Sequence, residues 1–191
     1  MNRFKNLKYV SIDLETSGLY PSQILQFSAI FEDPSKQLSF DEIPKFNRYI
    51  KYSQYKGSAF ALSLNSWILK ILNENKNLDI IKIDDLEDEF YNWIIQFIQP
   101  ENNSSKVYIN AAGKNFASFD LNFIKDAFVK RKVRIRHRVL DPSILYIQED
   151  DNQLPGSDEL LKRAGINKST THNAIQDAWD VITLLRKCYN N

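Results

Sequence analysis

Three strand-like segments near the start of the chain constrain its fold more than any other feature. They cover Lys8–Asp13, Ile24–Phe31 and Phe46–Tyr52, and the first and third alternate apolar and polar side chains as half-buried strands do. Gly18–Pro21, between the first two, is a turn signal. Strands joined by short connections form antiparallel meanders, so the sequence predicts an antiparallel start to a sheet.

Helical patterns dominate the rest of the chain. Apolar residues at steps of three and four predict helices over Ala61–Asn75, Asp84–Gln99, about Ala117 to Lys130, Ser157–Ala164 and Ala174–Cys188. Between them, Val107–Ala112 is predicted to be a buried strand and Val133–Asp141 to be extended, and Gly165 is predicted to end a helix in the left-handed conformation. Strands first, then strand–helix alternation, predict an α/β fold in which helices pack on a mixed sheet.

Length and composition narrow the class of protein. The 191 residues fit one domain, residues 1–191, with a helical segment at about residues 57–100. Lys and Arg number 25 against 24 acids, so any nucleic-acid contact must come from a local patch. The single cysteine, Cys188, excludes an intrachain disulfide and a multi-cysteine zinc site. No apolar run approaches membrane-spanning length and no signal peptide precedes the first strand, so we expect no membrane contact and a cytoplasmic location.

Two acids stand where the first predicted strand ends. Asp13 and Glu15 are two residues apart, so their side chains face the same side of the strand. Carboxylates this close repel each other unless a cation or a shared proton lies between them. The alternative is a strand edge with two solvated acids.

Two further acids open the apolar stripes of predicted helices. From Asp120 and from Asp177 the following apolar residues fall at helical spacing, and an acid on a buried stripe is costly unless it is paired or binds a metal. The alternative for Asp120 is a helix N-cap. A cap fits Asp177 less well, because its helix begins near Asn173. His172, five positions before Asp177, is one of two histidines in the chain, and its alternative is a solvated loop residue.

Together, four acids and one histidine describe a particular chemistry. Oxygen ligands with at most one nitrogen suit Mg²⁺ or Mn²⁺ rather than zinc. Two such ions about 3.5–4 Å apart stabilise the attacking and leaving oxygens of a phosphoryl displacement. A histidine can take a proton from the attacking water at neutral pH.

Three motifs in order resemble the DEDDh family of 3′–5′ exonucleases, whose members include DNA polymerase proofreading subunits such as the epsilon subunit of DNA polymerase III, ribonuclease T and oligoribonuclease. Asp13–Leu19 resembles the D-x-E-T-x-G-L motif at the end of the first strand. Asn115–Asp120 resembles the second motif, with an Asn shortly before Phe-Asp. His172–Ala178 resembles the third, H-x-A-x-x-D-A. The resemblance spans essentially the whole chain and implies a ribonuclease-H-like fold.

The resemblance also implies a function. The expected reaction is hydrolysis of phosphodiester bonds at the 3′ end of single-stranded DNA or RNA, releasing nucleoside 5′-monophosphates with two Mg²⁺ or Mn²⁺ ions. Asp13, Glu15 and Asp177 are expected to hold one ion, Asp13 and Asp120 a second, and His172 is the expected general base. The expected substrate contacts come from Leu14, Thr16, Leu19, Asn115 and Phe119.

The expected partners are single-stranded 3′ ends, with a polymerase or another tethering protein and a homodimer as further options. Two other functions stay open. One is an oligoribonuclease-like enzyme restricted to very short RNAs, and the other is a catalytically idle nucleic-acid-binding module of the same fold.

The second motif departs from the family pattern in two ways. Lys114 precedes Asn115, where many relatives have His, and the gap from this Asn to Asp120 is one residue longer than in the proofreading subunits.

Other residues have two interpretations each. Phe119 is expected either to stack on a base or to pack in the core. Asp141, before Pro142, is expected to start a turn rather than to bind metal. Asp180 is expected at the rim of the site or in solvent. The basic segment Lys130–Arg138 either contacts a phosphate backbone or is a solvated helix end and edge strand.

Overall fold

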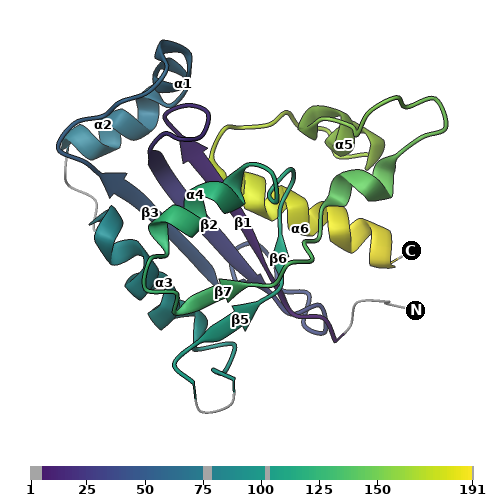
Figure 1. The fold of residues 1–191 in the computed structure, drawn as a ribbon. Coiled ribbons are helices and arrows are strands. Elements are labelled where there is room, and N and C mark those ends of the chain that lie inside the picture. The colour runs from purple at the N-terminus through teal and green to yellow at the C-terminus, as the bar shows by residue number, and fades with distance from the viewer. Residues whose placement is uncertain (1–5, 75–78, 102–103, 191) are drawn as a thin grey trace.

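A computed structural model describes residues 6–74, 79–101 and 104–190 (Figure 1). The first three strands are β1 (Tyr9–Thr16), β2 (Ile24–Glu32) and β3 (Lys45–Lys51), and they form the antiparallel meander that the sequence predicts. β1 runs three residues further than predicted, to Thr16. Asp13 and Glu15 therefore lie inside a strand whose backbone is fixed on one side by β2.

The main sheet has the strand order β4-β3-β2-β1-β6. The short strands β4 (Ile80–Lys82) and β6 (Ala111–Ala112) pair parallel to their neighbours, so the sheet is mixed, as predicted. β4 was not predicted, because three residues are too few for an alternation to show. β1 is an inner strand of this sheet, with β2 on one side and β6 on the other.

The predicted strand over 107–112 is divided between two sheets. Its first part, β5 (Val107–Ile109), pairs parallel with β7 (Val133–Ile135), and its second part is β6. The chain changes partner at Asn110, whose backbone carbonyl accepts a hydrogen bond from the Val10 N–H at 2.8 Å. The extended segment predicted over 133–141 is likewise reduced to β7 and a single bridge from Leu140 to β6.

Helices cover both faces of the main sheet (Figure 1). α6 (Ala174–Asn190) packs on one face, against Tyr9 and Ile30. α3 (Leu86–Ile94) and α4 (Asp120–Ala127) pack on the other, against the even-numbered residues of β1. Because side chains alternate along a strand, the odd-numbered residues of β1, including Asp13 and Glu15, lie on the α6 face.

Three predicted helices have different bounds in the structure. The helix predicted over Ala61–Asn75 is two helices, α1 (Ala59–Leu64) and α2 (Ser66–Glu74), and Asn75 itself lies outside the described residues. The helix is interrupted at Asn65. The carbonyl of Asn65 accepts hydrogen bonds from the N–H groups of Ile68 and Leu69, which belong to the second helix. The helix predicted over 84–99 is a 3₁₀ turn, η1 (Ile83–Asp85), followed by α3, and α4 begins at Asp120 rather than at 117.

The C-terminal part agrees with the sequence prediction. α5 (Ser157–Arg163) ends before Gly165, which has a left-handed φ of 68°, and the Ile166 N–H bonds back to the Leu161 carbonyl at 2.8 Å. η2 (Pro142–Tyr146) follows Asp141, whose side chain accepts from the Ser143 N–H, so the turn interpretation of Asp141 is confirmed. Within the described ranges, no helix has the length and apolar character that crossing a bilayer requires.

Candidate active site

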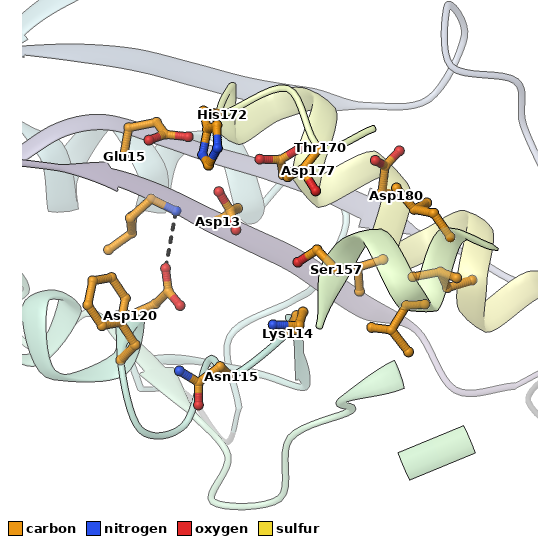
Figure 2. Close-up of a pocket in the computed structure, with 16 residues that line it drawn as sticks. Asp13, Glu15, Lys114, Asn115, Asp120, Ser157, Thr170, His172, Asp177 and Asp180 are labelled. Atoms are coloured by element: carbon orange, nitrogen blue, oxygen red, sulfur yellow. Dashed lines mark hydrogen bonds between the residues drawn. The ribbon is translucent and has the colours of Figure 1, made fainter. Parts of the chain in front are cut away.

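Three carboxylates from distant parts of the sequence meet over β1. Asp13 and Glu15 come from the same side of this strand, and Asp177 comes from the first turn of α6 (Figure 2). One carboxylate oxygen of each lies within 4.8 Å of the others. Glu15 is only 7% exposed, so these acids are not a solvated strand edge.

Burial raises the pKa of each of these carboxyls, and the charge of a neighbouring acid adds to the rise. Burial, with the charge of Asp177 added, raises the pKa of Glu15 to about 7. Burial also raises the pKa of Asp13 well above its ordinary value, and the charge of Asp120 is the next largest cause. The pKa of Asp177 is raised mainly by burial. Such a cluster is relieved by a cation, and its oxygen donors are those that Mg²⁺ and Mn²⁺ prefer.

Asp120 reaches the same site from α4. It is the first residue of that helix and is 4% exposed, and its Oδ1 accepts a hydrogen bond from the Leu14 N–H at 3.2 Å (Figure 2). Phe119 occupies the N-cap position, so Asp120 is not the helix cap. Burial raises the pKa of Asp120 to about 7. Asp120 thus lies beside the three-carboxylate cluster, close enough to raise the pKa of Asp13, without belonging to it.

His172 lies in the loop that leads into α6. Its φ of 50° is left-handed, which is uncommon for a residue other than glycine and is often found at functional sites. The side chain is exposed and lines the same cavity as the acids, as Figure 2 shows. The imidazole can therefore exchange protons both with solvent and with a molecule bound at the carboxylates.

A cavity of about 280 Å³ opens over these residues. Ser157 of α5 and Thr170 line one wall, and Lys114 and Asn115 line another (Figure 2). Among the described residues, Lys114 is the one lysine or arginine in this lining, and its charge opposes the rise in the pKa of Asp13. The cavity therefore has a cation facing the carboxylate cluster.

Asp180 also lines this cavity, so the rim or solvent position predicted for it is wrong. Asp180 is 7% exposed, and its carboxylate pairs with the ammonium of Lys168. Burial raises the pKa of Asp180, and the pairing with Lys168 opposes the rise. The helical spacing of α6 indicates only the face that packs on the sheet. α5 and the loop before α6 cover a second face of α6, which includes Asp180.

The residues expected to contact substrate divide between two adjoining cavities. Leu14, Asn115 and Phe119 line the carboxylate cavity. A second cavity, of about 260 Å³, is lined by Thr16 and Leu19. Leu14 and Phe119 line both cavities, so the two form one trough along the end of β1.

The second cavity has an exposed apolar rim, in which Leu19 is the residue that the sequence analysis singled out. Leu19 is 81% exposed and Phe60, from α1, is 77% exposed. Leu64, inside the helix predicted over Ala61–Asn75, is 37% exposed and lines the same cavity. α1 has no buried residue, whereas α2, beyond the break at Asn65, buries Ile68 and Leu72.

Hydrogen bonds hold together the two loops that form this cavity. The Ser17 hydroxyl donates to the Lys56 carbonyl at 2.6 Å, and the Ser17 carbonyl accepts from the Ser58 N–H at 2.9 Å. Gly57 packs so closely here that a Cβ would lie 2.0 Å from the Ser17 carbonyl oxygen. The apolar rim is therefore built on loops whose relative position is fixed.

Two of the expected substrate contacts already make local hydrogen bonds. The Thr16 hydroxyl donates to the Gly18 carbonyl at 2.8 Å. Asn115 has a left-handed φ of 56°, accepts from the Ser118 hydroxyl at its Oδ1, and donates its N–H to the Asp141 carboxylate at 2.9 Å. Asp141 thus also fixes the turn before Asp120, a role that the sequence did not predict.

Several solved structures, nucleases among them, share the fold of the chain. CRN-4, a cell-death related nuclease, superposes with a TM-score of 0.66 at 13% identity over 97% of this chain and 64% of its own. E. coli exonuclease I in complex with a 5cy-dA13 oligonucleotide gives a TM-score of 0.63 at 15% identity over 97% and 41%. S. pombe Pop2p in its Mg²⁺- and Mn²⁺-bound form gives 0.58 at 10% identity over 96% and 82%.

The chain has a ribonuclease H-like fold. That result confirms the predicted mixed α/β class with helices on both faces of the sheet. The chain spans less than two thirds of CRN-4 and of exonuclease I. No protein-family model and no curated protein sequence matches it. At these identities the likeness establishes the ribonuclease H-like fold, and the chemistry must be argued from the site.

Proposed function

We propose that the protein is a metal-dependent 3′–5′ exonuclease that hydrolyses the terminal phosphodiester bond of single-stranded DNA or RNA and releases nucleoside 5′-monophosphates. One observation carries the proposal above all. Asp13, Glu15 and Asp177 place carboxylate oxygens within 4.8 Å of one another, and Asp120 and His172 face the same cavity, in a fold shared with solved nucleases. The three motifs that resemble the DEDDh family contribute all five residues.

The donor set fits two divalent cations. Asp13, Glu15 and Asp177 would hold one ion, and Asp13 with Asp120 would hold a second. Such ions neutralise charge on the phosphate and lower the pKa of a water molecule. Pop2p was solved with Mg²⁺ and Mn²⁺, which supports the choice of ions. Burial, with repulsion from neighbouring acids added, raises the pKa of Asp13 and of Glu15, and a bound cation would offset this penalty on the charged carboxylates.

His172 takes the proton of the attacking water in this proposal. Its position in a loop at the edge of the cavity lets the imidazole pass that proton on to solvent. The charge of His172 already lowers the pKa of Asp177, so the two groups are close enough to influence each other. A general base contributes typically 10²–10⁴-fold to the rate.

The trough along the end of β1 binds the 3′-terminal nucleotides. The Thr16 hydroxyl oxygen still has a lone pair to accept a hydrogen bond from the terminal 3′-hydroxyl. Leu19, Phe60 and Phe119 provide apolar surface for the terminal bases, and base–aromatic stacking of this kind is tolerant of sequence. Lys114 and Asn115 face the phosphate that follows. Exonuclease I was solved with a bound single-stranded oligonucleotide, which supports this substrate class.

The proposal is tested on a gel with 5′-labelled single-stranded DNA and RNA of matched sequence. The protein is incubated with each strand in Mg²⁺, in Mn²⁺ and in EDTA, beside Asp13→Ala and His172→Ala. We expect a ladder that shortens from the 3′ end and disappears in EDTA and in Asp13→Ala. Intact strands in both metals, from a folded protein, would refute the exonuclease proposal and favour an idle binding module.

A dinucleotide on the same gel tests the oligoribonuclease-like alternative. Cleavage of the dinucleotide with longer strands left intact would show an enzyme restricted to very short RNAs. The matched control for both assays is Asp33→Ala, because Asp33 pairs with Lys8 and lines neither cavity of the trough. We expect this variant to cleave like the unaltered protein.

A further inference from the structure

A second groove lies between α4 and β7, apart from the trough. Its volume is about 530 Å³. On the α4 side it is lined by Leu121, Ile124 and Lys125, and Leu121 directly follows the site carboxylate Asp120. The other side is lined by residues of the basic segment, namely Arg131, Val133, Arg134, Ile135, Arg136 and His137. We call it the α4–β7 groove.

The basic segment is divided into neutralised and unpaired cations. Lys130 and Lys132 both pair with Asp88, at 2.5 and 2.7 Å, and Arg136 pairs with Glu101. These cations hold the segment to α3 and to the loop before β5.

Three cations without such a partner line the groove. Lys125, Arg131 and Arg134 are exposed, and none of the three has an ion-pair partner among the described residues. No acidic residue of the described ranges lines the groove. A chain with a net charge of +1 therefore has, at this place, a local excess of positive charge.

The floor between these cations is apolar. Phe128 and Val133 are buried, and Leu121 and Ile135 are half-buried in the lining. Grooves that bind single strands combine cations along the phosphate backbone with apolar or aromatic surface under the bases. The α4–β7 groove has both, and α4 connects it to the carboxylate site.

We infer that the α4–β7 groove binds the single strand on the 5′ side of the nucleotide held at the carboxylates, with Lys125, Arg131 and Arg134 contacting successive phosphates. This inference rests on the proposed function and adds a second binding segment to it. An acidic protein segment also complements such a groove in charge. The nucleic-acid strand is the occupant favoured here, because Leu121 of the groove directly follows the site carboxylate Asp120 on α4.

The test compares strands that are long enough to reach the groove with strands that are not. Binding of a fluorescein-labelled 12-nucleotide strand and of a trinucleotide is measured by anisotropy in EDTA, where no cleavage interferes. The variant is Arg131→Glu/Arg134→Glu. The control, Lys36→Glu/Lys187→Glu, makes the same change in net charge at exposed lysines that line neither the groove nor the trough.

We expect the double variant to bind the 12-mer about 100-fold more weakly at low salt and the trinucleotide unchanged. The slope of log affinity against log salt for the 12-mer should fall by about 1.4, since each phosphate contact on a single strand contributes roughly 0.7. The affinity of the milder Arg131→Gln/Arg134→Gln variant for the 12-mer should lie between those of the unaltered protein and the Glu double variant. Its melting temperature should be unchanged.

Equal binding of the 12-mer by variant and control would overturn the inference, and so would an equal loss for the trinucleotide. If the unaltered protein cleaves no strand in Mg²⁺ or Mn²⁺, the proposed function fails by itself. The anisotropy result still decides whether the groove binds nucleic acid. An acidic peptide is added as a competitor to test the other occupant of the groove. A peptide that fails to displace the 12-mer supports the inference. A peptide that binds the groove when the 12-mer does not bind there would refute it.

Discussion

The carboxylate site and the basic segment each gather charges of one sign, but they differ in whether those charges are paired with charges of the other sign. Asp13 and Glu15 lie against other acids, and no described lysine or arginine pairs with either. In the basic segment, Lys130 and Lys132 each have the Asp88 carboxylate within 2.7 Å, and Glu87, 1% exposed, accepts their backbone N–H groups. The first region is repulsive without a ligand, whereas Lys130 and Lys132 of the second are paired by the chain itself.

This difference distinguishes a site from a structural contact. A buried cluster of like charges lowers stability, so it persists only where the rest of the fold stabilises it and a bound cation relieves it. Paired charges need no ligand, so their presence alone indicates no function. The α4–β7 groove lies between these cases, because part of its basic lining is paired and part is not.

The strongest test of the comparison is Asp13→Asn. Removing a ligand to both cations should lower activity by about a thousandfold or more, since several kcal/mol of charge stabilisation is lost. The same change should raise the melting temperature of the metal-free protein at pH 8, because a buried repulsive charge is removed. Single-turnover cleavage and thermal unfolding in EDTA measure the two effects. A variant that is both inactive and less stable would contradict the view of this cluster as repulsive.

His172→Ala should lower the rate by about 10²–10⁴-fold while leaving the fold and the cation site intact. The rate loss should shrink as pH rises, because hydroxide replaces the missing base. Cleavage rates from pH 6 to 9, together with Mn²⁺ titration by thermal unfolding, check this prediction. Weakened Mn²⁺ binding would show instead that His172 is a ligand.

The stability of the metal-free protein should depend on pH in a definite direction. Burial raises the folded-state pKa of Glu15 from 4.5 to about 7, so the folded protein holds its proton more tightly than the unfolded chain does. Stability should therefore fall as pH rises from about 5 to 8, by roughly 3 kcal/mol from Glu15 alone. Mn²⁺ should raise the melting temperature more at pH 8 than at pH 5.5. A metal effect independent of pH would argue against binding at these acids.

Glu87→Ala should have the opposite effect on stability from Asp13→Asn. It leaves the N–H groups of Lys130, Lys132 and Val133 without their acceptor, and we expect a loss of about 2 kcal/mol in the free energy of unfolding. Urea unfolding measures it. The control is Asp88→Ala, which breaks only exposed ion pairs and should cost less than about 1 kcal/mol. Equal losses would mean that burial of Glu87 is not what matters.

Phe60→Ala should have the smallest effect and should act on substrate alone. Loss of one stacking surface should raise KM about tenfold with kcat little changed, because stacking contributes about 1–3 kcal/mol per base. The fold should be unaffected, since Phe60 is 77% exposed. Steady-state cleavage of a labelled strand measures both constants, and a fall in kcat alone would place Phe60 outside the binding trough.

The sequence by itself predicted the antiparallel meander, the mixed α/β class and the residues that meet at the site. These depend on short-range rules. Alternation along β1 puts Asp13 and Glu15 on one side, and helical spacing puts Asp177 at the start of the buried face of α6. The end of α5 at Gly165 follows from local backbone conformation in the same way.

Only the tertiary structure decided how separate elements cover one another. The division of 107–112 between two sheets at Asn110 depends on which strands lie beside it, and the burial of Asp180 depends on α5. Which cations of the basic segment stay unpaired depends on where α3 places Asp88. These outcomes rest on contacts between residues far apart in sequence, and no periodicity in a single segment records them.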